Sequence, residues 1–445
     1  MASIEPTYAE TIAWLQGLEV SKGWDLKLDR MREALAVRGH PERRFRALHV
    51  AGTNGKGSTA AMLESILRAA GHRTGLYTSP HLVDFAERIR AGGLAIPHDA
   101  VVALVAELRA TVEPARIELT HFEFATLLAF EWFARIGVAV AVIEVGLGGR
   151  LDATNVLAPL VTGITSIGRD HEEFLGSDIP GIAREKAGIA RAGVPLVVGR
   201  VPTDASAAIG AVAADAGAPL VDVVRETTLD DTPDGLAFRG LGVSWEGLAL
   251  GVPGAFQRDN ARTALTMLAA ARDVLPIDAD AVRAGLAAAR WPGRLAEVVG
   301  RDAAGPRVVA DGAHNPDGIA ALIRELPGLG RPITLVFAVM ADKAWEDMLA
   351  ALVPHVARIV ATRVGRRGLD PARIVAAAAG RVPVEAVEPA ADAIVHARAT
   401  TDAAALVLIA GSLFLVGEAY ACLRHDESLV PAWQGWDRIG TQARP

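Results

Sequence analysis

The sequence predicts an α/β fold with parallel sheets that helices cover on both faces. Short apolar runs rich in Val, Ile and Leu alternate with longer Ala- and Leu-rich stretches, which is the pattern of parallel strands and their covering helices. The length of 445 residues exceeds one ordinary domain core, so we expect two domains. The clearest predicted strands are residues 47–50, 138–143, 160–167, 307–310, 333–339 and 406–410.

These strands also predict where the chemistry lies and where the chain divides. Each run leads into Gly, Asp, His or Ser, and ligands of open α/β sheets bind beyond the carboxyl ends of the strands. Residues 291–294 (WPGR) break the regular pattern, and a new strand–loop–helix pattern starts near Arg307. We therefore expect one domain over residues 1–295 and a second over residues 296–445.

Composition excludes several classes of protein. Hydrophobic residues make up 51% and charged residues 22%, as in globular proteins, and a net charge of -7 offers no basic field for nucleic acid. Residues 403–417 are apolar but fall short of the about 20 residues of a membrane-spanning helix, so we expect a strand, a turn and the start of a helix. One cysteine and a start without signal-peptide features predict a cytoplasmic protein.

The first motif is a glycine-rich loop at residues 49–59 (HVAGTNGKGST), between a predicted strand and a predicted helix. Such a loop turns backbone N–H groups toward phosphates, Lys56 adds a positive charge and a hydroxyl can hold Mg²⁺. The strict phosphate-loop pattern is not met, because Val50 replaces its first Gly and Gly57 separates Lys56 from Ser58. A plain glycine-rich turn is the alternative. The predicted nucleotide-binding residues are Gly52, Thr53, Asn54, Gly55, Lys56, Gly57, Ser58 and Thr59.

A carboxylate follows the strand predicted at residues 138–143. Glu144 arrives where the strand ends, just before the turn at residues 146–149 (GLGG). A buried carboxylate without a partner would cost several kcal/mol, and Mg²⁺ would remove that cost. The alternative is a structural ion pair with Arg150. Both interpretations remain open on this segment alone.

Two further pairs of polar residues stay ambiguous at this point. Asp170 and His171 follow the strand predicted at 160–167, which we expect beside the strand that ends at Glu144. His171 is either a metal ligand or an ordinary core or surface residue, because hard cations prefer oxygen. Glu185 and Lys186 lie in a helical stretch and would ordinarily form a solvated charge pair.

Taken together, the motifs resemble the folylpolyglutamate synthase and dihydrofolate synthase family, a branch of the Mur ligases. The resemblance covers nearly the whole chain, and the Gly inserted after Lys56 is similar to the family's own version of the loop. The motifs are HVAGTNGKGST (49–59), TSPHL (78–82), ERIR (87–90), HFEFAT (121–126), EVGLGGRLDATN (144–155), DH (170–171), EKAGI (185–189), WPGRL (291–295), DGAHNP (311–316) and DK (342–343).

The resemblance implies a large ATP-binding domain and a smaller Rossmann-like C-terminal domain with the reaction in the cleft between them. It implies that Lys56 holds the phosphates and that His314 faces the reaction centre. It further implies a carbamylated Lys186 that helps to order the metal site. The implied ligands of two Mg²⁺ ions are Ser58 for the first and Ser79, Glu144 and His171 for the second, and the implied further nucleotide contacts are Asn260, Arg294 and Asp311.

The resemblance also indicates the pterin side of the site. Segments 79–82 and 121–124 are similar to the family's pterin-side loops, so Ser79, Pro80 and His81 are predicted to bind substrate. A flat heteroaromatic ring favours aromatic stacking, which Phe122 and Phe124 could supply. On a strand these two side chains would share a face, and on a helix they would diverge. The alternative is that both belong to the core.

The function that the resemblance implies is an ATP-dependent ligase that adds L-glutamate to dihydropteroate, to reduced folates, or to both, through an acyl phosphate. We expect a monomer that acts on small molecules, away from nucleic acid and membranes. Two rivals are a Mur-type ligase on a cell-wall precursor and an ATP-binding switch without ligase chemistry. Arg169 and Ala344 depart from the family pattern, which usually has an uncharged residue before the Asp-His pair and a second acidic residue after the Asp-Lys pair.

Overall fold

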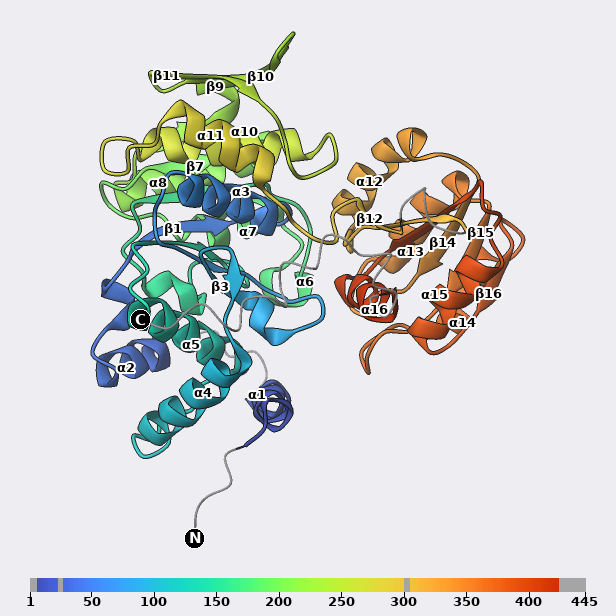
Figure 1. The fold of residues 1–445 in the computed structure, drawn as a ribbon, viewed down its shortest axis with the longest axis horizontal. Coiled ribbons are helices and arrows are strands. Elements are labelled where there is room, and N and C mark those ends of the chain that lie inside the picture. The colour runs from blue at the N-terminus through green and yellow to red at the C-terminus, as the bar shows by residue number, and fades with distance from the viewer. Residues whose placement is uncertain (1–5, 23–26, 300–304, 424–445) are drawn as a thin grey trace.

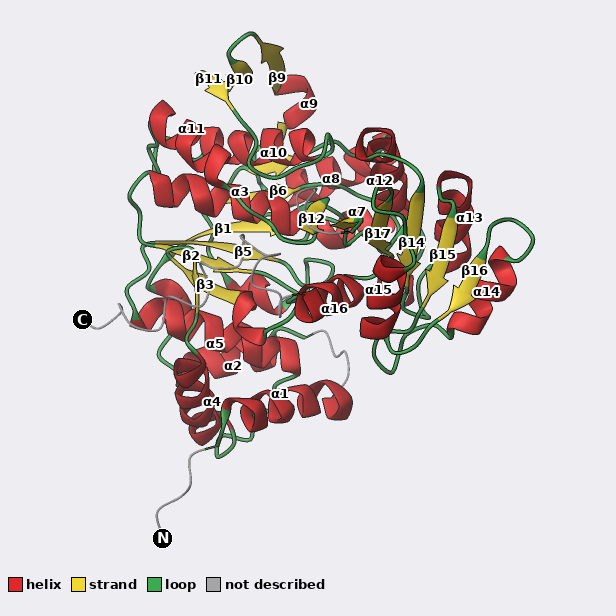
Figure 2. Cartoon of the chain, turned by 45° about the vertical axis from the view of Figure 1, so that its right-hand side comes forward, coloured by secondary structure: helices red, strands yellow, loops and turns green. Residues whose placement is uncertain are grey.

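The computed structural model describes residues 6–22, 27–299 and 305–423, and the predicted α/β class is confirmed (Figure 1). The described strands form one sheet of eight strands, one of six and a small antiparallel sheet of three. The two large sheets belong to two parts of the molecule that lie side by side, with α12 and α16 of the smaller part facing the larger part (Figures 1 and 2).

The eight-stranded sheet has the order β4-β3-β2-β5-β1-β6-β7-β8. Its pairs are parallel from β2 to β8, and β3 and β4 add an antiparallel edge. The small sheet runs β11-β10-β9 and covers a layer of helices. The strands are β1 (Arg46–Ala51), β2 (Thr74–Tyr77), β3 (Ile89–Ala91), β4 (Leu94–Ala95), β5 (Val140–Glu144), β6 (Val161–Ile164), β7 (Leu196–Val198), β8 (Leu220–Asp222), β9 (Thr227–Thr232), β10 (Gly235–Gly240) and β11 (Val243–Leu248).

Helices cover both faces of this sheet because its strands are apolar on both faces. Along β5, Val140 and Val142 pack toward α3, α10 and α11, and Ala141 and Ile143 pack toward α1, α2, α4 and α5. The helices are α1 (Tyr8–Lys22), α2 (Asp29–Val37), α3 (Lys56–Ala69), α4 (His98–Val112), α5 (His121–Arg135), α6 (Glu172–Leu175), α7 (Ile179–Ala187), α8 (Thr203–Ala216), α9 (Val223–Glu226), α10 (Gln257–Ala270) and α11 (Ala279–Ala288), with short 3-10 turns η1 (Pro41–Arg43), η2 (Phe85–Arg88) and η3 (Ala153–Val156).

The six-stranded sheet has the order β12-β13-β17-β14-β15-β16, parallel except for β12. Helices α12, α13 and α14 pack on one face, and α15 and α16 on the other. The elements are β12 (Ala296–Val299), β13 (Arg307–Ala310), α12 (Pro316–Leu329), β14 (Ile333–Phe337), α13 (Trp345–Leu352), η4 (Val353–His355), β15 (Arg358–Ala361), α14 (Pro371–Ala378), β16 (Val384–Ala386), α15 (Ala390–Ala399), β17 (Leu406–Ala410) and α16 (Leu413–Leu423).

All six predicted strands exist, but three are shorter than the apolar runs that predicted them. The run at 138–143 starts too early, because the Val138 amide instead donates to the Phe133 carbonyl and closes the end of α5. The runs at 160–167 and 333–339 extend past the strand ends at Ile164 and Phe337, because their last apolar residues are buried in loops beyond the sheet. Apolar runs therefore record burial rather than strand length.

Two features of the C-terminal part bear on earlier expectations. Residues 403–417 form β17, a turn and the start of α16, as predicted, and within the described residues no helix is both long and apolar enough to span a membrane. The first strand of the six-stranded sheet begins at Ala296. For this reason we propose residue 295 as the end of the first domain.

Candidate active site

The loop between β1 and α3 has the geometry of an anion-binding turn. β1 ends at Ala51 and α3 begins at Lys56, so a strand precedes the loop and a helix follows it, as predicted. The first-turn amides of α3 have no acceptor within the helix, and a helix N-terminus attracts anions. The Lys56 Nζ donates to the carbonyl oxygens of Gly52 (3.0 Å) and Thr53 (3.2 Å), which holds the ammonium against the loop. The first-turn amides of α3 and the Lys56 ammonium thus lie together, as an anion-binding site requires.

Close contacts explain the glycine that separates Lys56 from Ser58 and the glycine before Lys56. A Cβ atom at Gly57 would lie 2.5 Å from the indole ring of Trp291, and one at Gly55 would lie 2.1 Å from Oδ1 of Asn260. Both positions therefore require glycine. The Arg90 guanidinium also lies over the Trp291 ring, 5.2 Å from its centre. Sequence reasoning missed Trp291 as a site residue, although the WPGRL motif contained the signal.

Glu144 is a buried carboxylate at the carboxyl end of β5. Its one hydrogen-bond donor among the described residues is the Ser79 amide, at 3.1 Å. Burial raises the pKa of Glu144 to about 7, against the opposing charge of Lys56. Arg150 instead forms an ion pair with Glu185 at 2.9 Å, so the proposed pairing of Glu144 with Arg150 is wrong.

Lys186 is a buried amine on α7, and its Nζ donates to the Gly52 carbonyl at 3.0 Å. Burial lowers the pKa of Lys186 to about 7, and the nearby charge of Lys56 lowers it further. The alternative of a solvated Glu185–Lys186 pair is therefore wrong, because only Glu185 reaches solvent. The amine is held directly beneath the glycine-rich loop, by the carbonyl that Lys56 also contacts.

Asp170 and His171 follow β6, which is separated from β5 by β1, so the expectation of neighbouring strands is corrected. Asp170 accepts hydrogen bonds from Lys343 Nζ (2.5 Å) and Asn315 Nδ2 (3.1 Å), and His314 Nε2 lies 3.3 Å away. Burial opposes ionisation, but His314, His171 and Lys343 together hold the pKa of Asp170 well below its usual range. The C-terminal domain thus supplies the partners of Asp170.

A second polar contact joins the glycine-rich loop to the C-terminal domain. The side-chain amides of Asn54 and Asn315 exchange hydrogen bonds of 3.1 and 3.0 Å, and Asn315 also caps α12 through the Gly318 amide. Nearby, burial raises the pKa of Asp317, and the charge of Arg169 opposes this change. The charge of Arg169, which departs from the family pattern, thus acts on Asp317 of α12.

Arg294, Asp311 and His314 lie where the second domain begins. Asp311 is buried and accepts hydrogen bonds from the amides of Leu295 (2.9 Å) and Ala313 (2.8 Å). Burial raises its pKa, and the positive charge of Arg294 opposes this change. The His314 Nδ1 lies 2.7 Å from the Gly312 carbonyl. Arg294, at the end of the first domain, and Asp311 and His314, in the loop between β13 and α12, are therefore close together.

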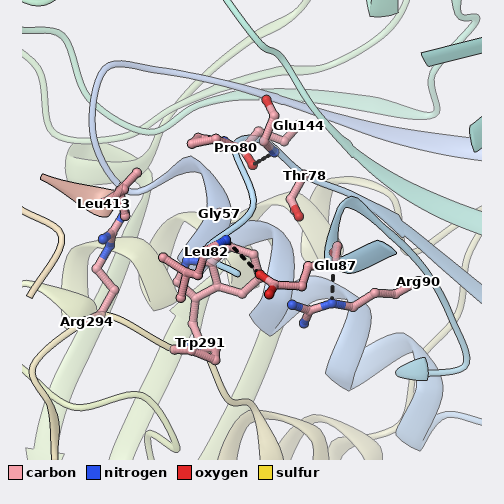
Figure 3. Close-up of a pocket in the computed structure, with 12 residues that line it drawn as sticks. Gly57, Thr78, Pro80, Leu82, Glu87, Arg90, Glu144, Trp291, Arg294 and Leu413 are labelled. Atoms are coloured by element: carbon pink, nitrogen blue, oxygen red, sulfur yellow. Dashed lines mark hydrogen bonds between the residues drawn. The ribbon is translucent and has the colours of Figure 1, made fainter. Parts of the chain in front are cut away.

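A cavity of about 50 Å³ lies between the two domains (Figure 3). Glu144 lies at one side of it, and Arg294 and Trp291 lie at the other. This volume is far below the about 300 Å³ or more of an ordinary ligand pocket, so substrate entry requires movement of side chains or domains. The lining residues are Gly57, Thr78, Ser79, Pro80, Leu82, Glu87, Arg90, Glu144, Trp291, Pro292, Arg294 and Leu413.

The predicted metal ligands are only partly brought together. Ser79 and Glu144 touch and line the cavity, Ser58 lies in the first turn of α3, and His171 begins α6 with a pKa lowered by burial to about 4. The Lys56 charge reaches both Glu144 and His171. In the described part of the chain, no three His, Cys, Asp or Glu side chains form a metal-binding cluster. Hydroxyl groups and ligand oxygens would have to complete any Mg²⁺ shell.

The predicted aromatic pair is separated by its helix. Phe122 and Phe124 lie on α5 rather than on a strand, so they diverge. Phe124 is 1% exposed and packs edge-on against Trp14, so its predicted role as a substrate-stacking ring is wrong and the core alternative is correct. Phe122 is half-buried, with its ring against Gly146, where a Cβ would lie 2.4 Å away, and 6.1 Å from the Tyr77 ring.

The loop of Ser79, Pro80 and His81 is fixed by the 3-10 turn that follows it. Glu87 accepts hydrogen bonds from the amides of Leu82, Val83 and Asp84. The Arg88 Nε donates to His81 Nδ1 at 2.8 Å, and burial lowers the pKa of His81 to about 3. Ser79 and Pro80 therefore face the cavity from a rigid loop, whereas the His81 ring is turned toward Arg88.

Comparison with known proteins places this site in context. Residues 50–268 match the Mur ligase middle domain, and residues 293–413 match the Mur ligase glutamate ligase domain. The Bacillus subtilis dihydrofolate synthase/folylpolyglutamate synthase is 38% identical over 78% of this chain and 82% of its own. A Haloferax volcanii protein described as a probable bifunctional folylpolyglutamate synthase/dihydropteroate synthase is also 38% identical, but this chain spans only 47% of its length.

Two solved structures share the fold over their whole length. The structure of E. coli FolC in complex with DHPP and ADP has a TM-score of 0.86 and 36% identity, covering 95% of this chain and 100% of that one. A bifunctional folylpolyglutamate synthase/dihydrofolate synthase with Mn, AMPPNP and L-glutamate bound has a TM-score of 0.84 and 33% identity, with coverage of 95% and 100%.

Proposed function

Because the chain belongs to the folylpolyglutamate synthase/dihydrofolate synthase family of ATP-dependent Mur ligases, we propose that it adds L-glutamate both to dihydropteroate and to reduced folates. The observation that carries the proposal is the position of Glu144 and the Lys56 loop at the domain junction. Glu144, a buried carboxylate with a raised pKa, lines the same cavity as Gly57 of the loop, and the charge of Lys56 acts on it.

The two anions of the first step need positive charge between them. The acceptor carboxylate attacks the γ-phosphorus of ATP, ADP leaves, and an acyl phosphate forms. Lys56 and the first-turn amides of α3 would hold the phosphates and offset the charge of the transferred group. The amine of glutamate then attacks the acyl carbon, and phosphate leaves as the amide forms. Closure of the domains around this junction would exclude water from the acyl phosphate.

The residues around the loop fit hard divalent cations. We propose Ser58 as a ligand of one Mg²⁺ and Ser79, Glu144 and His171 as ligands of a second, because the Ser79 amide already contacts Glu144 and no cationic side chain of the described residues forms an ion pair with Glu144. Such ions would screen the phosphates and polarise the P–O bond. A relative with Mn and AMPPNP bound supports a divalent cation at this type of site.

The chemistry of Lys186 supports a carbamate. An amine must lose its proton before it reacts with CO₂, and a pKa of about 7 makes a neutral amine abundant at physiological pH. We propose that Lys186 is carbamylated in the resting enzyme and that the anion helps to order the metal ligands. Asn260, Arg294 and Asp311 are the proposed nucleotide contacts and His314 the proposed group facing the reaction, since all four lie beside the loop or the junction.

Two further properties of the enzyme are its compartment and its oligomeric state. All proposed substrates are small anions, and the one cysteine of the chain suits a reducing compartment. We propose a cytoplasmic monomer.

One assay separates this function from its rivals. Purified protein with ATP, Mg²⁺ and L-glutamate is given dihydropteroate, tetrahydrofolate, a uridine-linked cell-wall precursor or no acceptor, and ADP release is followed. We expect both pterin acceptors to support turnover that disappears without glutamate. Turnover with tetrahydrofolate alone would refute the dihydropteroate activity. Turnover with the cell-wall precursor, or ADP release independent of glutamate, would refute the proposed function altogether.

A further inference from the structure

A second cavity, of about 420 Å³, lies in the N-terminal domain and shares no lining residue with the cavity at the domain junction. It lies between the α2–η1 region, η3 and the segment after α7. Its charged wall consists of Arg32, Arg43, Arg191 and Glu42, with His40 beside them. In a chain of net charge -7, three guanidinium groups around one carboxylate are a local excess of positive charge.

Arg191 is the fixed part of this charge. Its two terminal nitrogens donate to four oxygens, the carbonyls of Gly188 (3.3 Å) and Ala190 (3.0 Å) and the carbonyl (2.7 Å) and side-chain oxygen (2.6 Å) of Asn155. These are neutral acceptors, and no acidic side chain of the described residues forms an ion pair with Arg191. Its guanidinium is thus rigidly positioned, with its charge uncompensated.

Arg32 faces this charge across the cavity. Burial lowers the pKa of Arg191, and the positive charge of Arg32 is the second cause of that shift. Among the described residues, Arg32 forms an ion pair with Asp29 alone, at 3.3 Å, and both of these side chains are mostly exposed, so the ion pair is weak. An anion placed between Arg32 and Arg191 would replace this repulsion with two electrostatic attractions, although the terminal N–H groups of Arg191 already have acceptors.

Glu42 is the carboxylate of the cavity wall, and one of its two oxygens lacks a hydrogen-bond donor among the described residues. Its Oε1 pairs with His40 Nδ1 (3.0 Å) and Arg43 Nε (3.3 Å). Its Oε2 is buried and has no hydrogen-bond partner among the residues that the structure describes, and the side chain, which is 6% exposed, lines the cavity. A buried acceptor of this kind costs stability until a donor reaches it. The remaining lining includes the apolar residues Leu35, Val156 and Leu157.

We propose that this cavity is a second ligand site that binds a nucleoside monophosphate. Glu42 and Asp29 offset part of the three guanidinium charges, and the positive charge that remains favours a phosphate monoester, whose charge is about -2. The base would lie against the apolar lining. The volume also lies within the usual range of about 300–1,000 Å³ for small-molecule sites.

Binding of AMP to the full chain tests this site, with the active site first saturated with AMPPNP and Mg²⁺. Isothermal titration calorimetry should show one AMP per chain, with adenosine and inorganic phosphate each binding at least about tenfold more weakly, because each lacks one half of the contacts. Absence of AMP binding at millimolar concentration would overturn the proposal. Inorganic phosphate binding as tightly as AMP would overturn the nucleotide assignment.

Matched variants separate this site from the surface charge of the protein. R32S should weaken AMP binding by about tenfold or more, whereas R239S, which removes an exposed arginine of β10, should leave it unchanged. R191M should abolish binding, but Arg191 also ties Asn155 to the loop after α7 and its loss threatens the fold. R32S therefore decides the question, because its side chain is exposed. Unchanged AMP binding in R32S would contradict the proposal.

Discussion

Two buried carboxylates near the domain junction have opposite environments. Asp170 contacts Lys343, His314 and Asn315 of the C-terminal domain, and its pKa lies well below the usual range. Glu144 has a single backbone donor, and burial raises its pKa to about 7. The carboxylate is therefore a stable anion at Asp170, whereas ionisation of the more deeply buried Glu144 is unfavourable. The difference lies in the partners that the protein itself supplies.

Two lysines, the buried Lys186 and the partly buried Lys343, show the same contrast. Lys343 has the Asp170 carboxylate at 2.5 Å, whereas Lys186 has, among the described residues, the Gly52 carbonyl as its one hydrogen-bond acceptor and a pKa lowered to about 7. A buried ionisable group without a counter-charge costs stability and persists where a ligand or a covalent change completes it. We infer that Asp170 and Lys343 hold the domains together. We also infer that Glu144 gains its counter-charge from a ligand and that Lys186 is changed covalently.

The largest expected effect on turnover comes from Lys56, a residue of the proposed ATP-binding loop. Lys56→Ala should lower kcat by about a thousandfold or more, because no other side chain of the loop carries a positive charge that could offset the charge of the phosphates. The melting temperature should hardly change, since Lys56 contacts only two loop carbonyls. Arg225→Ala, which removes an exposed cation of α9, is the matched control and should retain full activity. Near-normal turnover of Lys56→Ala would refute the nucleotide assignment.

Lys186→Ala should lower turnover by about a hundredfold, because the proposed carbamate supplies a negative charge beside the metal ligands. Acetate should partly restore its activity, since a small carboxylate can occupy the vacated space. Arg184→Ala on the exposed face of the same helix should need no rescue. Intact activity in Lys186→Ala would rule out the role, and a mass spectrum of the intact wild-type protein under CO₂ would detect the added carbamate directly.

The smallest expected effect distinguishes the two phenylalanines of α5. Phe122→Ala should raise KM for dihydropteroate by about tenfold, with KM for ATP unchanged, because a half-buried ring near the Gly146 turn can still reach a ligand. Phe124→Ala should instead cost about 3–5 kcal/mol of unfolding free energy, since Phe124 is a core residue. Equal effects of both variants on KM and stability would contradict the separation.

Local patterns predicted the parts of the site that lie on consecutive residues. The glycine-rich loop lies between a strand and a helix, and Glu144 lies at a strand end, because apolar periodicity and glycine positions determine these features within a few residues. The fold class followed from the same alternation. For Glu144 and Lys186 the ordinary charge-pair alternatives failed, because burial depends on the packed structure and not on neighbouring residues in the chain.

Contacts between distant segments were beyond the reach of these patterns. Trp291 presses on Gly57 from a position 234 residues away along the chain, and Lys343 reaches Asp170 across 173 residues. No periodicity encodes such pairs. Phe122 and Phe124 show a different failure, because their spacing fits either a strand or a helix and only the capping box at Thr120 and Glu123 marks the helix start.

The stability of two isosteric variants tests the contrast between the two carboxylates most directly. Above pH 7 the folded state carries Glu144 ionised at a cost that the unfolded state, with its lower pKa, does not bear. Glu144→Gln should therefore raise the unfolding free energy of the ligand-free protein by about 2 kcal/mol at pH 8, with no gain near pH 4, while abolishing turnover even at raised Mg²⁺.

Asp170→Asn should do the reverse. Its depressed pKa means that Asp170 contributes stability throughout the range above pH 4, so the variant should lose about 1–3 kcal/mol at pH 8 by leaving Lys343 without its counter-charge. Urea unfolding of both variants at pH 8 without nucleotide or Mg²⁺ is the decisive measurement. Opposite signs are the predicted result, and destabilisation of both variants to the same extent would contradict the account.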